Sequence, residues 1–81
     1  MDKDQILGTV SSIVAEICGV EKDAVNENST VGDFPAWDSV GHLSILSKVE
    51  ETYDISFEPE EMMEIEDVKD IVEAVYNILQ K

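Results

Sequence analysis

The 81-residue sequence predicts an all-α fold: a small four-helix bundle with three longer helices, one short third helix, and a long loop between helices one and two. In three separate segments, apolar residues recur at intervals of three and four, which is typical of amphipathic helices. Strand-like alternation appears only over residues 54–57, which is too short to support a sheet. We therefore expect one domain, residues 1–81, built around one apolar core.

The first helix is expected from the apolar stripe that runs from Ile6 to Ile17. Asp2 is a suitable N-terminal cap, and Gln5 three positions later completes the pattern of a capping box. Gly19 is expected to end the helix.

The segment between this helix and Asp38 has no helical period and is rich in Asn, Ser, Thr, Asp, Gly and Pro. Apolar residues still recur along it, so we expect an ordered loop that is anchored on the core. The expected anchors are Val20, Val25, Val31 and Phe34.

The helical period returns at residue 39 and predicts a second helix, Ser39–Tyr53. Its expected buried stripe leaves Ile45 outside, and Gly41 near its start lowers the helical propensity. The residues of this stripe are Val40, Leu43, Leu46, Val49 and Tyr53.

A short third helix is expected where Pro59 can occupy a first helical position, ahead of Glu60, Glu61 and the Met62–Met63 pair. The fourth helix is expected over residues 66–80, with one apolar face. That face consists of Val68, Ile71, Val72, Val75, Ile78 and Leu79.

The composition is strongly acidic, with 19 Asp and Glu against five Lys, no Arg, a net charge of −14 and an isoelectric point near 4.1. This balance excludes nucleic acid and anionic membranes as partners, because both require a cationic surface. Between Glu50 and Glu73, eleven carboxylates face the single cation Lys69. We expect proteins with basic patches as partners.

Cys18 is the only cysteine, so it cannot form an internal disulfide or a zinc cluster, and we expect a buried, unreactive thiol. The first residues lack the basic and apolar regions of a signal peptide, and no apolar run is long enough to span a membrane. A cytoplasmic monomer is the expectation for such a small, highly charged chain.

The most informative residues are Asp38 and Ser39, which stand immediately before the apolar pattern of the second helix. Either can cap the helix, and the unpaired backbone N–H groups of the first turn attract negative charge. A phosphodiester on Ser39 would suit that field, whereas a plain N-cap serine is the alternative interpretation.

The chain resembles acyl carrier proteins over nearly its whole length. The resemblance rests on Asp38-Ser39-Val40, on residues 50–55 that end the second helix, and on residues 65–68 that open the last. It implies that 4'-phosphopantetheine is attached to Ser39 by a phosphopantetheinyl transferase, and that the arm carries acyl groups as thioesters to partner enzymes. It also implies that the protein is not itself an enzyme.

The resemblance further implies roles for other residues. Asp38 would hold the helix start and aid transferase recognition, with Val40 beside it. Glu50, Glu51 and Asp54 are the expected docking charges for basic patches on synthases and transferases. Residues expected in the core, and also candidates to contact a sheltered acyl chain, are Val40, Leu43, Leu46, Ile65 and Val68.

The sequence departs from carriers of fatty-acid synthesis early in the second helix, where Gly41, Ser44 and Lys48 stand at positions that are often acidic. Ala36 replaces a glycine often found two residues before the Asp–Ser pair. Trp37 and His42 place an aromatic ring and an imidazole beside the site. These features resemble stand-alone carriers of specialised or surface-polysaccharide pathways.

Parts of the sequence suggest three alternative functions. A small serine hydrolase could use Ser39 and His42, which share a helix face, but no third residue is placed to orient the imidazole, so we expect His42 to be solvated. A calcium loop beginning at Asn26 would need glycine where Val31 stands and a carboxylate where Trp37 stands, so no metal site is expected. An unmodified acidic interaction domain remains the principal alternative.

Overall fold

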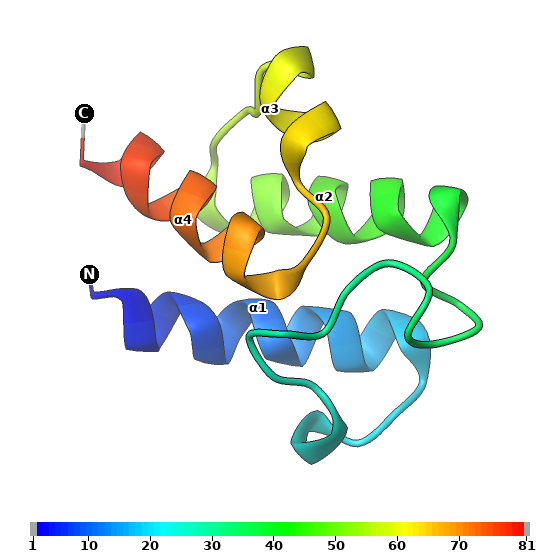
Figure 1. The fold of residues 1–81 in the computed structure, drawn as a ribbon. Coiled ribbons are helices and arrows are strands. Elements are labelled where there is room, and N and C mark those ends of the chain that lie inside the picture. The colour runs from blue at the N-terminus through cyan, green and yellow to red at the C-terminus, as the bar shows by residue number, and fades with distance from the viewer. Residues whose placement is uncertain (1, 81) are drawn as a thin grey trace.

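The computed structural model describes residues 2–80 and confirms the all-α fold (Figure 1). Its α-helices are α1 (Lys3–Cys18), α2 (Ser39–Tyr53), α3 (Pro59–Glu64) and α4 (Val68–Leu79), and a 3₁₀ turn η1 (Lys22–Ala24) lies in the first loop. α2 begins and ends where the sequence predicts. The 3₁₀ turn was not expected, and it interrupts the long loop between α1 and α2.

α1 packs against both α2 and α4, and it runs in the opposite direction to each (Figure 1). α1 therefore starts at the same end of the molecule where α4 finishes, and Lys3 forms a 2.9 Å salt bridge there with Glu73. Within residues 2–80, no helix has the length and apolar character needed to cross a bilayer.

The predicted ends of α1 are confirmed. Asp2 Oδ1 accepts a hydrogen bond from the backbone N of Gln5 at 2.9 Å, and Gln5 Oε1 accepts one from the backbone N of Asp2, which completes the capping box. Gly19 ends the helix in the left-handed conformation with φ 69°, where a side chain would be strained.

α4 begins at Val68, two residues later than predicted, because Asp67 is extended and caps the helix by accepting from the backbone N of Asp70. The first free N–H groups of α4 donate to carbonyls of the long loop. The N–H of Val68 donates to Ser29 O at 2.9 Å, and that of Lys69 donates to Glu27 O at 3.0 Å. The loop thus provides acceptors for the unpaired N–H groups at the start of α4, and these hydrogen bonds fix the loop to the helix.

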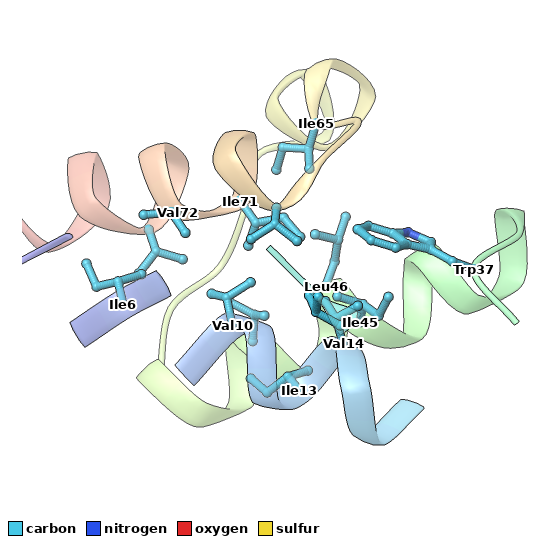
Figure 2. Close-up of a cluster of buried hydrophobic side chains, with 14 of the residues drawn as sticks. Ile6, Val10, Ile13, Val14, Trp37, Ile45, Leu46, Ile65, Ile71 and Val72 are labelled. Carbon is cyan, nitrogen blue, oxygen red and sulfur yellow. The ribbon is translucent and has the colours of Figure 1, made fainter. Parts of the chain in front are cut away.

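The loop is anchored on the core, but not by all the predicted residues. Val25 is buried and Val20 and Phe34 are partly buried against the core, whereas Val31 is 39% exposed. The principal anchor is Trp37, which is completely buried, and its ring points into the apolar cluster (Figure 2). Trp37 precedes Asp38 and Ser39 as the sequence indicates, but its ring is part of the core and is not presented at the surface.

The buried face of α2 also differs from the prediction. Ile45 is completely buried beside Leu46 and Val49, while Val40 and Leu43 are 72% and 55% exposed. The first turn sets this orientation, since Gly41 lies against the preceding loop and residues four apart continue its line into the core. The first two residues of the predicted buried stripe, Val40 and Leu43, therefore face solvent.

α3 has no fully buried residue. Met62 packs partly against the core, and Met63 is exposed. This short helix reaches the core through Met62, and the residues that flank it, Phe57 and Ile65, supply the buried side chains of the segment.

Candidate functional site

Ser39 is the first residue of α2 and is exposed. The cap is Asp38, whose Oδ1 accepts a hydrogen bond from the backbone N of Gly41 at 2.8 Å. The carbonyl oxygen of Asp38 accepts the first helical bond, from the N of His42 at 2.8 Å. Ser39 is therefore not the cap, and in the part of the chain that the structure describes its hydroxyl has no hydrogen-bond partner.

The backbone that presents Ser39 is fixed by the loop before it. The N–H of Gly32 donates to Trp37 O at 2.9 Å, and the N–H of Trp37 donates to Phe34 O at 2.9 Å. Farther back, the N–H of Val31 donates to Glu66 O at 3.0 Å, which joins the loop to the α3–α4 connection. Three backbone hydrogen bonds thus hold the loop that leads to Ser39.

Gly41 has a structural purpose that its helical propensity did not suggest. The backbone of Ala36 crosses the first turn of α2 so closely that a Cβ at position 41 would overlap the carbonyl oxygen of Ala36. Only glycine permits this approach, which brings the loop onto the helix immediately before Ser39.

His42 is not solvated, contrary to expectation. The Nε1–H of Trp37 donates to His42 Nδ1 at 3.0 Å, and His42 Nε2 lies 3.0 Å from the carbonyl oxygen of Ile65. Because an indole can only donate, Nδ1 is the acceptor, and Nε2 of the neutral ring carries the proton and donates to Ile65. Both ring nitrogens are engaged, so neither is available as a base for Ser39.

Sequence reasoning missed this pair, although one signal could have found it. Trp37 stands immediately before the cap and His42 at the fourth helical position, which are the two positions joined in a hydrophobic staple. Here the two rings are nearly parallel, with centroids 6.2 Å apart, and a hydrogen bond joins them.

The exposed face of α2 extends from the serine along the helix. Val40 and Leu43 present apolar side chains to solvent beside Ser39. They border an open hollow that continues past a lysine to an acidic residue. Its lining residues are Val40, Leu43, Ser44, Ser47, Lys48 and Glu51.

The five residues predicted to contact a sheltered acyl chain do not share one environment. Val40 and Leu43 lie on the outer face of α2, whereas Leu46 and Val68 are completely buried and Ile65 is 5% exposed. The three inner residues belong to the buried core cluster, in which Leu46 and Ile65 are labelled in Figure 2.

The three predicted docking carboxylates also differ. Glu51 and Asp54 are exposed, and Asp54 ends α2 in the left-handed conformation with φ 54°. Glu50 is half-buried, and its Oε2 accepts a hydrogen bond from the backbone N of Phe57 at 2.8 Å. Glu50 therefore has a structural role, which the sequence did not indicate.

The remaining groups that the sequence raised as candidates are Asn26, at the start of a possible calcium loop, and the thiol of Cys18. Asn26 Oδ1 accepts from the N–H of Asn28 at 2.8 Å within a turn, and no three metal-ligating side chains come together among residues 2–80. Cys18 is partly buried, rather than buried as the sequence predicts, and desolvation by this burial raises the pKa of its thiol, which disfavours the reactive thiolate.

The arrangement is suited to attachment rather than to catalysis. A fixed, exposed hydroxyl stands at a capped helix N-terminus, where free N–H groups favour an attached anion. The imidazole nearest to it is occupied by two hydrogen bonds. Fold and site together define a small helical protein with an exposed serine at the capped start of its second helix.

Comparison with known proteins agrees with that class. Residues 8–75 match the family described as the phosphopantetheine attachment site. The acyl carrier protein of Kocuria rhizophila is 31% identical over 75 residues, which cover 93% of each chain. The non-reducing polyketide synthases dbaI of Emericella nidulans and tazA of Aspergillus terreus are 28% and 29% identical, and the match covers 3% of each synthase.

The chain belongs to the phosphopantetheine-attachment family and is a homologue of acyl carrier proteins. It is a non-catalytic carrier whose prosthetic group is phosphopantetheine, and its partners include a phosphopantetheinyl transferase and the enzymes that use the carried group.

Proposed function

We propose that Ser39 is the attachment residue and that the chain carries acyl intermediates on a 4'-phosphopantetheine arm. The observation that carries the proposal is the exposed Ser39 hydroxyl, free of hydrogen bonds within residues 2–80, at the Asp38-capped start of α2. When bound, the arm supplies a thiol that holds an acyl group as a thioester and raises its local concentration at each partner's active site.

The residues around Ser39 fit a phosphodiester. Asp38 holds the first turn of α2, and the backbone N–H groups at the helix start offer a favourable field for the phosphate. Asp38 and the exposed side chain of Val40 flank the serine and would be read by the transferase. No bulky side chain needs to move, because Ser39 is already accessible.

The same face of α2 is the proposed docking surface. An enzyme that receives the arm must approach Ser39, which brings it over Val40 and Leu43. Glu51 and Asp54 supply exposed negative charge farther along, for a partner with a basic patch. Glu50 contributes to the same field while it also holds Phe57.

We place the carrier in a specialised or polysaccharide biosynthetic pathway rather than in fatty-acid synthesis. The first turn of α2 has no acidic residue, and Lys48 lies on the exposed face. Two of the relatives are polyketide synthases, and one is an acyl carrier protein. The proposal includes a cytoplasmic monomer, since a charge of −14 opposes self-association.

The attachment is tested by incubating the chain with coenzyme A and a broad-specificity phosphopantetheinyl transferase, followed by intact-mass measurement. We expect the mass of one phosphopantetheine to be added to the wild type and to Ser47→Ala, whose altered serine is exposed on the same helix. Ser39→Ala should gain nothing. No gain in the wild type would favour the unmodified interaction domain, and a gain in Ser39→Ala would place the arm elsewhere.

The pathway is tested by isolating the chain from its own cells and measuring the mass of the group on the arm. An amino acyl, hydroxy acyl or polyketide group would support the specialised assignment. A saturated fatty acyl series would contradict it and leave the carrier function intact.

A further inference from the structure

α2 holds both ends of the α3 segment by hydrogen bonds. At the entry to α3, Glu50 Oε2 accepts from the backbone N of Phe57 at 2.8 Å. At the exit, His42 Nε2 lies 3.0 Å from the carbonyl oxygen of Ile65. The remaining hydrogen bonds of α3 in the described part of the chain are local to residues 58–65.

α3 itself adds little to its own attachment. None of its residues is fully buried, and Met62 alone of its apolar pair packs against the core. Segments with few buried contacts open at a low free-energy cost, well below that of global unfolding. The two hydrogen bonds from α2 therefore act together with the buried side chains of Phe57 and Ile65, and with the hydrogen bond from the N–H of Val31 to Glu66 O, in keeping α3 in place.

Of these two hydrogen bonds, the one made by His42 lies nearer to Ser39. His42 lies one turn after Ser39, and its other nitrogen accepts from the buried Nε1–H of Trp37. If His42 let go of Ile65 and rotated away, the indole N–H would also lose its partner inside the apolar core, which is unfavourable. The indole, the imidazole and the Ile65 carbonyl should therefore separate together.

We propose that His42 is a positioning residue that latches α3 over the core. With the latch closed, Leu46, Ile65 and Val68 are covered, and a cargo on the arm stays outside the bundle. With the latch open, α3 can lift and expose these apolar side chains to a long acyl chain. The part of this inference that concerns cargo rests on the proposed carrier function.

The latch is tested first on the unmodified chain, by amide hydrogen exchange. His42→Leu removes both hydrogen bonds, and His42→Gln supplies one acceptor and one donor. We expect α3 amides of His42→Leu to exchange about tenfold faster or more, the factor expected for one lost hydrogen bond, with α1 amides unchanged. His42→Gln should resemble the wild type. Equal acceleration in α1 and α3, or none in α3, would overturn the latch.

A measurement on the wild type alone covers the case in which His42→Leu does not fold. The Trp37 indole N–H and the α3 amides should exchange in the same local opening, at a free energy below that of α1. Exchange of the indole N–H only with global unfolding, while α3 opens earlier, would overturn the proposal.

The consequence for cargo is tested on the modified chain loaded with acetyl or octanoyl groups. In His42→Leu, the octanoyl form should be stabilised relative to the acetyl form more than in the wild type or His42→Gln, as measured by thermal unfolding. Equal differences in all three chains would overturn the control of cargo access. If no arm can be attached, the proposed function is wrong. The latch is then decided by the hydrogen-exchange experiment, which uses the unmodified chain.

Discussion

The carbonyl oxygen of Ala36 lies against the Cα of Gly41, in the space that any larger residue at position 41 would fill with its Cβ. Gly41→Ala must therefore displace either the loop or the first turn of α2, and the clash is with backbone, which cannot rotate aside. We expect a loss of about 1–3 kcal/mol in the free energy of unfolding, measured by urea denaturation. The rate of modification at Ser39 should also fall.

Gly8 provides the matched control. It lies inside α1, where a Cβ would meet only the Lys22 Nζ at 3.9 Å, an ordinary contact. Gly8→Ala should raise stability by about 0.5–1 kcal/mol, because alanine restricts the unfolded chain and favours the helix. Similar losses at both positions would show that the close approach at Gly41 is not the cause.

Asp38 combines two roles that substitutions can separate. Asp38→Ala removes the oxygen that accepts from the N–H of Gly41 and should cost about 1 kcal/mol in the free energy of unfolding. Asp38→Asn keeps a capping oxygen and should leave stability nearly unchanged. If the transferase reads the charge, Asp38→Asn will nevertheless be modified more slowly, as followed by intact mass over time. Normal modification of a stable Asp38→Asn would reduce Asp38 to a cap.

The helices could be predicted because local signals specify them. Asp2 with Gln5 and the final Gly19 define α1, and the return of the helical period after Asp38 sets the start of α2. α4 was predicted two residues too early, because Glu66 belongs to a long-range pairing with the first loop. No pattern within the last helix indicates that pairing.

The site was predicted less completely, since its supports join residues that are distant in the sequence. The hydrogen bond from His42 to Ile65 spans 23 positions, and that from Phe57 to Glu50 depends on the path of the chain after α2. Periodicity alone also predicts the wrong buried face for α2. The backbone contact at Gly41, rather than the number of apolar residues, orients that helix. The position of Ser39 at the start of α2 could be predicted, because the helical period begins directly after Asp38.

Glu50 and Glu51 are neighbours with different roles, and charge changes should separate them. Glu50→Ala leaves the N–H of Phe57 without its acceptor and should cost about 1 kcal/mol in the free energy of unfolding. Glu51→Lys changes an exposed side chain and should alter stability by less than about 0.5 kcal/mol. Denaturant unfolding of both variants would establish the difference.

Partner binding should show the opposite order. Glu51→Lys is expected to weaken binding to an isolated partner enzyme more at low salt than at high salt, because exposed charges are screened. Asp54→Asn is a suitable second variant, since asparagine tolerates the left-handed conformation at the end of α2. A loss of binding that is insensitive to salt would argue against electrostatic docking by these residues.

Cys18 and the thiol of the arm should react at different rates. Burial raises the pKa of the Cys18 thiol from its ordinary value of 9.0, so the folded chain holds less thiolate at a given pH than the unfolded chain does. In the modified protein at mildly alkaline pH, we expect one fast alkylation, on the arm, and one slow alkylation, on Cys18, resolved by mass spectrometry. The unmodified chain should show only the slow reaction, and denaturant should accelerate it. Fast alkylation of Cys18 in the folded, unmodified chain would contradict its burial.

The raised pKa of Cys18 also makes stability depend on pH. The thiol does not affect the free energy of unfolding below pH 9.0, and that free energy falls above pH 9.0 because the thiol of the unfolded state ionises first. Cys18→Ala should therefore lose less stability than the wild type between neutral pH and pH of about 10.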